Sequence, residues 1–109
     1  GWLCQSEYEW AQHEVIGTAA GLTAGEIQRI KEGPEAEWSE LDRLILLATD
    51  ELYHDKKISD ATWVALTSHW NDQQMMDLVF AIGQYTLVSM ALRTFGVPLD
   101  DFLTGWDRT

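Results

Sequence analysis

The sequence contains little cysteine and little positive charge. Its single cysteine, Cys4, excludes an internal disulfide framework and is typical of a reducing compartment, so we expect a cytoplasmic location. No basic segment followed by an apolar stretch resembles a signal peptide. Seven basic residues face 18 acidic ones, for a net charge of −11. This balance argues against partners such as nucleic acid or an anionic membrane, because both require a basic surface.

Long apolar runs are also missing. The longest charge-free run, residues 78–92, is shorter than the roughly 20 residues of a membrane-spanning helix and includes polar residues such as Gln84 and Ser89. We therefore interpret this run as a helix buried in a protein core, and we expect no membrane partner. No segment alternates apolar and polar residues between turn signals, so β-strands are not expected.

Apolar residues at helical spacing are abundant. Hydrophobic residues make up 46% of the 109 positions, which is enough for one globular domain covering residues 1–109. The pattern predicts an all-α fold with four main helices and one short helix. We expect helices from near the start to about residue 20, between Thr23 and residue 33, from Ser39 to about residue 56, from Ser59 to about residue 70, and from Asn71 to Phe95. The apolar tail after residue 96 is expected to pack back onto the fold or onto another subunit.

Two capping boxes mark helix starts within this pattern. Thr23 is followed three residues later by Glu26, and Asn71 is followed by Gln74. The start of the chain lacks such a cap although apolar spacing is already present there. We therefore expect the chain to begin inside a helix and to be the C-terminal part of a longer native chain.

Glu9 and His13 form the clearest candidate for chemistry. Residues four apart share one face of a helix, and a carboxylate can orient an imidazole that transfers protons near neutral pH. Trp2, Ser6 and Ile16 are in phase with the pair, so it lies in an apolar or small stripe. A buried titratable pair is a site candidate, whereas an exposed Glu–His pair on a helix surface is the structural alternative.

Other residues give weaker indications. Metal binding is not expected, because the histidines and acidic residues show no paired spacing typical of a metal site. Cys4 has no partner cysteine or basic neighbour, which favours a buried, unreactive thiol. Gln84 and Tyr85 are polar residues in the predicted buried helix; they either form structural hydrogen bonds or line a substrate pocket.

Four short segments together resemble the carboxymuconolactone decarboxylase family, which includes the AhpD-type alkylhydroperoxidases. They are residues 9–13 (EWAQH), 20–23 (AGLT), 81–85 (AIGQY) and 95–99 (FGVPL). The resemblance covers roughly residues 1–103 and implies an all-α fold, assembly as a homo-oligomer (a trimer or hexamer) and further helices ahead of this region.

The resemblance also implies roles for individual residues. The peroxidase branch carries two cysteines seven and four residues before the histidine, where this chain has Ser6 and Glu9. The decarboxylase branch instead carries a glutamate four residues before the histidine. By resemblance, His13 and Glu9 are the catalytic residues of a cofactor-independent lyase that acts on a small carboxylate or carbonyl substrate. Its expected substrate-binding residues are Tyr8, Trp10, Gln84 and Tyr85.

Two alternatives remain open at this stage. The first is an AhpD-like peroxidase (peroxiredoxin-type) activity that depends on Cys4. The second is a non-enzymatic, oligomeric small-molecule-binding protein in which the Glu9–His13 pair is structural. A substrate with several negative charges also requires a nearby cation, and no arginine lies beside this pair in the sequence.

Overall fold

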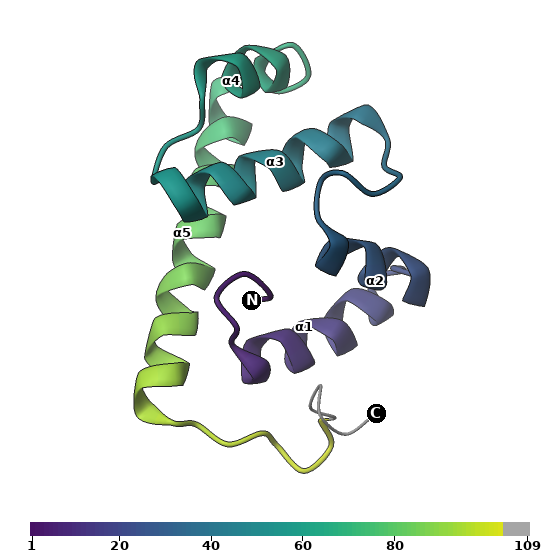
Figure 1. Ribbon diagram of the computed structural model, residues 1–109, viewed down its shortest axis with the longest axis vertical. Coiled ribbons are helices and arrows are strands. Elements are labelled where there is room, and N and C mark those ends of the chain that lie inside the picture. The colour runs from purple at the N-terminus through teal and green to yellow at the C-terminus, as the bar shows by residue number, and fades with distance from the viewer. Residues whose placement is uncertain (104–109) are drawn as a thin grey trace. The chain divides into compact units, whose positions relative to one another are not determined.

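A computed structural model describes residues 1–103, and these residues contain five helices and no strand (Figure 1). The predicted all-α class is therefore confirmed. The helices are α1 (Glu7–Ala19), α2 (Ala24–Glu32), α3 (Glu40–Asp55), α4 (Asp60–Thr67) and α5 (Asp72–Phe95). The end of the expected apolar tail lies outside the described residues.

The chain divides into two compact units. The first unit comprises Gly1–Gln28 with Tyr85–Thr109, and the second comprises Arg29–Gln84. Helix α5 contributes its N-terminal half to the second unit and its C-terminal half to the first. All residues of the candidate site described below belong to the first unit, with the exception of Gln84.

Side-chain caps fix the helix starts that the sequence predicts. The Thr23 amide donates to Glu26 Oε1 at 3.0 Å, and the Glu26 amide donates to Thr23 Oγ1 at 3.1 Å. Asn71 and Gln74 form the same reciprocal pair at 3.0 and 2.9 Å. Both predicted capping boxes are therefore confirmed. Each supplies acceptors for amides that have no partner inside the helix.

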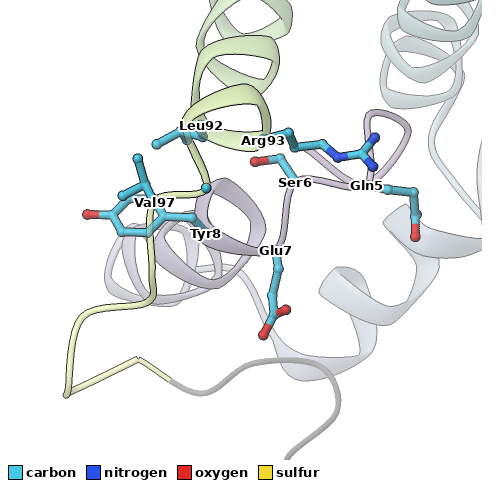
Figure 2. Close-up of a pocket in the computed structure, with 8 residues that line it drawn as sticks. Gln5, Ser6, Glu7, Tyr8, Leu92, Arg93 and Val97 are labelled. Atoms are coloured by element: carbon cyan, nitrogen blue, oxygen red, sulfur yellow. The ribbon is translucent and has the colours of Figure 1, made fainter.

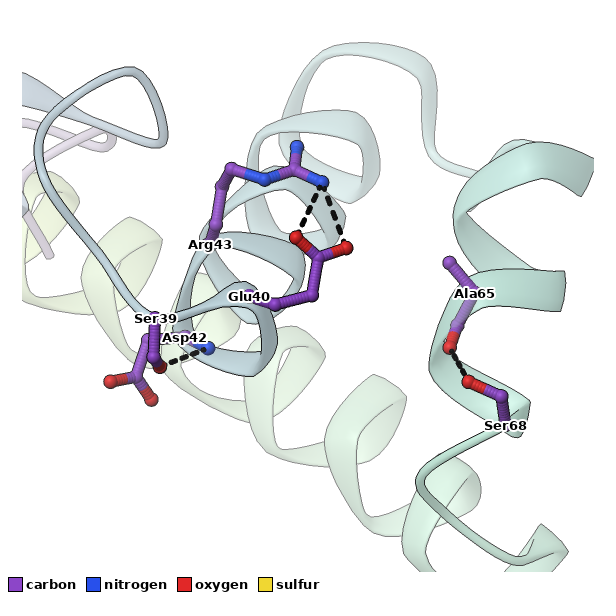
Figure 3. A network of polar contacts seen from close by, with 6 residues as sticks. All are labelled: Ser39, Glu40, Asp42, Arg43, Ala65 and Ser68. Atoms are coloured by element: carbon purple, nitrogen blue, oxygen red, sulfur yellow. Dashed lines mark hydrogen bonds and ion pairs between the residues drawn. The ribbon is translucent and has the colours of Figure 1, made fainter.

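Helix α3 begins in a similar way. The hydroxyl of Ser39 accepts a hydrogen bond from the Asp42 amide at 3.3 Å, and Arg43 pairs with Glu40 on the exposed side of the first turn (Figure 3). The surface ion pair contributes little stability, because solvent screens it. The cap therefore matters more than the ion pair for where the helix starts.

The second unit has its own apolar core. Its buried members are Leu44, Ala48, Ile58, Leu66 and Met75, drawn from α3, the following loop, α4 and the start of α5. Burial of these side chains is the main favourable term for this unit, at about 1.5–3 kcal/mol for each large aliphatic side chain.

One carboxylate ties α3 to α4 within the second unit. Glu51 accepts hydrogen bonds from the Ser59 amide and the Thr62 hydroxyl, each at 2.7 Å. Burial alone raises the pKa of the Glu51 carboxyl, but these hydrogen bonds outweigh burial and lower it. The charged form of Glu51 therefore stabilises the connection between the two helices.

The prediction that α5 is a buried central helix is wrong. Phe80 is 70% exposed, and Leu87 and Met90 are each 56% exposed. By length and composition α5 is able to cross a membrane, and only 11% of its most apolar 18-residue window is buried. Uniform apolarity marks a helix that is covered, but it does not say whether the same chain provides the cover.

The prediction that the first helix starts near residue 1 is also wrong. Residues 2–5 form turns, and Gln5 has a φ of 54°. Such a left-handed backbone conformation interrupts a helix, so α1 begins only at Glu7. The end of α1 matches expectation, because Gly21 follows it with a φ of 110°.

Candidate functional site

The Glu9 carboxylate lies buried between α1 and α5. Glu9 is 4% exposed, and the fully buried hydroxyl of Ser89 donates a hydrogen bond to its Oε2. The Gly1 nitrogen lies 3.8 Å from Oε1. A buried carboxylate requires such donors because it has lost its hydration. Glu9 therefore connects the two helices of the first unit.

His13 contacts Glu9 through the main chain. Its Nδ1 lies 2.9 Å from the Glu9 carbonyl oxygen. A carbonyl oxygen only accepts hydrogen bonds, so Nδ1 carries the proton and Nε2 of the neutral ring is left with a lone pair. The half-buried imidazole also packs edge-on against Tyr85, with ring centroids 4.9 Å apart and an interplanar angle of 82°. His13 is thus oriented as a proton acceptor at Nε2.

A pocket of about 280 Å³ opens beside the start of α1 (Figure 2). Its walls come from the two ends of the first unit and consist of Gln5, Ser6, Glu7, Tyr8, Leu92, Arg93, Gly96 and Val97. Arg93 crosses to the N-terminal turn and donates to the Cys4 carbonyl oxygen at 3.2 Å. The structure therefore places a cation at the wall of this pocket, although His13 does not line it.

Three contacts pair the same two segments in reversed order. Arg93 meets the backbone of Cys4, Ser89 meets Glu9, and Tyr85 meets His13. Residues 85, 89 and 93 are spaced by four, so they share one face of α5. Side chains on this face of α5 therefore reach both the Glu9–His13 pair and the turn ahead of α1 that borders the pocket.

Ser6 and Tyr8 are polar residues in the wall of the pocket. Ser6 is 1% exposed, and its Oγ has no hydrogen-bond partner although Ser6 occupies the N-cap position of α1. The Tyr8 hydroxyl donates to Asp100 Oδ2 at 2.9 Å. This hydrogen bond, together with burial and the negative charge of Asp100, raises the pKa of Tyr8.

The other predicted substrate-binding residues, Trp10, Gln84 and Tyr85, do not line the pocket. Trp10 is 9% exposed and packs edge-on against Trp2, with ring centroids 5.4 Å apart. Tyr85 lies beside His13, whereas Gln84 is exposed and belongs to the second unit. Of the predicted set, Tyr8 lines the pocket and Tyr85 contacts the imidazole.

Within residues 1–103, few groups suit thiol or metal chemistry. Cys4 is a free, half-buried cysteine. No group of three His, Cys, Asp or Glu side chains in that range is arranged to hold a metal ion. The Glu9–His13 pair and the pocket therefore remain the candidates for a functional site.

Ser89 and Arg93 are the site residues that sequence reasoning missed. They lie 80 and 89 residues from their partners Glu9 and Cys4. The available signal was their spacing, because two polar residues four apart give an otherwise apolar helix one polar stripe. A polar stripe on such a helix faces a polar partner or a site, and here it faces Glu9 on α1 and the turn that precedes α1.

Comparison with known proteins assigns no family. No protein-family model, curated protein or solved structure matches the chain. The geometry of the first unit and the short segments quoted above are therefore the basis for the functional proposal.

Proposed function

We propose that this protein is a cofactor-independent lyase, similar to carboxymuconolactone decarboxylases, that acts on a small carboxylate or carbonyl compound. His13 is the catalytic residue and transfers a proton through Nε2. The observation that carries the proposal is the 2.9 Å contact between His13 Nδ1 and the Glu9 carbonyl oxygen. This contact fixes both the tautomer and the direction of the ring, which general acid–base catalysis requires.

In the proposed step, the bond between the substrate's carboxylate carbon and its neighbouring carbon breaks. Carbon dioxide leaves, and the electron pair remains on the substrate carbon as an enolate or carbanion. His13, protonated beforehand at Nε2 by water, delivers that proton to the carbon. The substrate thus exchanges CO₂ for a hydrogen, and the neutral imidazole takes up another proton from water. No external oxidant or reductant is needed.

Glu9 acts in this scheme as a positioning residue. Its main chain holds the imidazole, while its carboxylate binds Ser89 on α5. The two interactions fix His13 relative to α5 and to the ring of Tyr85. The role of Glu9 is therefore to keep the proton-transferring ring in place, which is a common source of rate enhancement.

We further propose that the protein is a cytoplasmic homo-oligomer. Between Asp77 and Arg93, α5 has no charged residue, and large apolar side chains on it are exposed. Two acidic chains repel each other in general, but charge-free faces can meet without bringing carboxylates together. A second copy of the chain is therefore the best occupant for the exposed side of α5.

One observation favours a second candidate function. The pocket is lined by Ser6 and Arg93, while His13 is not among its lining residues. A non-enzymatic small-molecule-binding protein needs only the pocket, with the Glu9–His13 pair as part of the fold. Turnover distinguishes the two candidates, because only the enzyme releases CO₂.

The test is CO₂ release from carboxymuconolactone and small β-keto acids in D₂O. Proton NMR shows whether deuterium enters the carbon that loses CO₂. The proposal expects turnover by the wild-type chain and a loss of at least about a hundredfold in His13→Ala, in line with the contribution of general acid–base catalysis. His54→Ala is the matched control, because His54 is exposed on α3 in the second unit.

A further inference from the structure

We propose that the pocket between the start of α1 and the end of α5 binds the carboxylate of a small, singly charged organic acid. Arg93 pairs with the carboxylate, and Ser6 with the first turn of α1 completes the polar part of the site. This inference concerns binding and goes beyond the proposed function, since it does not depend on His13 transferring a proton.

The charge of Arg93 is the first argument. The chain carries a net charge of −11, yet no carboxylate of residues 1–103 forms an ion pair with Arg93. Its Nη1 instead donates to the Cys4 carbonyl, which anchors the side chain and leaves further N–H groups of the fork for a ligand. An arginine held in this way at a pocket wall suits a planar carboxylate.

The buried hydroxyl of Ser6 is the second argument. A buried polar atom normally has a hydrogen-bond partner, and Ser6 Oγ has none. Ser6 does not use its hydroxyl to cap α1. Figure 2 shows the hydroxyl pointing toward the middle of the ring of lining residues. A ligand oxygen there would satisfy a group that the fold leaves unpaired.

The start of α1 adds a weaker contribution in the same direction. Ser6, Glu7 and Tyr8 are the N-cap and the first two helical residues, and they form one wall of the pocket. The N-terminal end of a 13-residue helix carries partial positive charge and amides without intrahelical partners. Both favour an anion at this position.

The rest of the lining defines the ligand class. Leu92, Val97 and the ring of Tyr8 provide apolar surface for a hydrocarbon portion. The Glu7 carboxylate also borders the pocket, although Figure 2 shows it pointing away from the guanidinium of Arg93. Arg93 is one positive charge, and the Glu7 carboxylate lies nearby, so the pocket compensates a ligand with one negative charge better than a ligand with two. A monocarboxylate with a small apolar body therefore fits better than phosphate.

The site has a defined relation to the imidazole. Ser6 and His13 are seven residues apart on α1, which corresponds to roughly 10 Å of helical rise. A short carboxylic acid bound at Arg93 therefore does not reach His13 Nε2 with the same carboxylate.

The experiment is calorimetric titration of the full chain with benzoate, with benzamide as the uncharged analogue of the same shape. We expect saturable benzoate binding with a Kd of about 1 mM or tighter, and benzamide binding weaker by at least about tenfold. Arg93→Gln should weaken benzoate binding by about tenfold or more, whereas Arg43→Gln, on the exposed side of α3, should leave it unchanged. His13→Ala should bind benzoate like the wild type, which separates this inference from the proposed reaction.

Several results would overturn the inference. They are equal affinity for benzoate and benzamide, unchanged benzoate binding in Arg93→Gln, tighter binding of inorganic phosphate than of benzoate, or no benzoate binding at all.

Circular dichroism checks that Arg93→Gln is folded. Ser6→Ala provides a second variant that keeps Arg93 in place: it should weaken benzoate binding about threefold or more, and unchanged affinity would remove Ser6 from the site. Amide shifts in NMR should move at Ser6, Tyr8 and Val97.

Discussion

The main-chain oxygen of Glu9, rather than its carboxylate, contacts the imidazole of His13, with Nδ1 at 2.9 Å. The carboxylate instead accepts the hydroxyl of Ser89 on α5. The same residue therefore orients the imidazole and joins the two helices that form the site. Substitutions at Ser89 should therefore affect mainly stability, whereas substitutions at His13 should affect mainly the proposed reaction.

The Ser89–Glu9 hydrogen bond should contribute to stability. Ser89→Ala removes the hydroxyl donor and leaves the buried carboxylate of Glu9 underpaired, which should lower the free energy of unfolding by about 1–3 kcal/mol. Urea unfolding followed by circular dichroism measures the change. Thr94→Ala, at an exposed position on α5, is the control and should shift the midpoint little. Equal effects of the two substitutions would contradict a structural role for this bond.

The Tyr8–Asp100 hydrogen bond should tether the segment after α5. Tyr8→Phe removes the hydroxyl that donates to Asp100, so amide exchange in residues 97–103 should accelerate about threefold or more. Because the pKa of Tyr8 is raised in the folded state, the contribution of this contact is fully present below pH 10.0 and is lost as pH rises through the folded pKa.

Hydrogen–deuterium exchange with mass spectrometry measures this effect peptide by peptide. Tyr53→Phe is the control, because it removes a phenolic hydroxyl in the second unit. Protection of residues 97–103 that does not differ between Tyr8→Phe and the wild type would show that the tether is unimportant.

Glu51 should make the stability of the second unit depend on pH. Its pKa is lowered from 4.5 in the folded state, so its stabilising contribution is fully present above the unfolded pKa and is lost as pH falls through the folded pKa. Because solvent screens this partly exposed carboxylate, Glu51→Gln should be less stable than the wild type at about pH 6 by only about 0.5–1 kcal/mol, and the difference should shrink toward pH 3. Urea midpoints at the two pH values provide the measurement. A gap that is independent of pH would show that the charge of Glu51 is not the stabilising feature.

The exposed side of α5 should be covered by a second copy of the chain. Light scattering after gel filtration should show an oligomer for the wild type. Phe80→Glu places a charge on the contact face and should weaken association by about tenfold or more, whereas Val64→Glu on α4 should not. The two positions are matched, with 70% and 67% exposure. A wild-type monomer, or recruitment to lipid vesicles without self-association, would contradict the proposal.

Local sequence signals predicted the helices well. Each of the four helix starts predicted at Thr23, Ser39, Ser59 and Asn71 directly precedes an observed helix. Such signals succeed because a cap and its helix start lie within three or four residues, so no distant part of the chain is involved. The start of α1 was predicted wrongly, because apolar spacing extends to Trp2 and does not reveal that the backbone turns at Gln5.

Contacts over long sequence distances were beyond the reach of sequence patterns. The Glu9–His13 pair was identified from a spacing of four, but the main-chain oxygen of Glu9 contacts His13, while the carboxylate that was expected to orient the imidazole binds Ser89. The partners of this region, Ser89 and Arg93, come from the other end of the chain, and no periodicity specifies which α5 residue meets which α1 residue. Burial of α5 was predicted wrongly, because apolarity records that a helix is covered and not which molecule covers it.

The most direct test of the central proposal, proton transfer by His13, is deuterium incorporation during decarboxylation in D₂O. The wild-type chain should release CO₂ from carboxymuconolactone or a small β-keto acid and place deuterium on the carbon that loses it. His13→Ala should lose at least about a hundredfold in rate while it remains folded and still binds benzoate. Equal turnover by His13→Ala and the wild type, or no turnover of these acids by the wild type, would contradict the assignment of His13 as the catalytic residue of a decarboxylase.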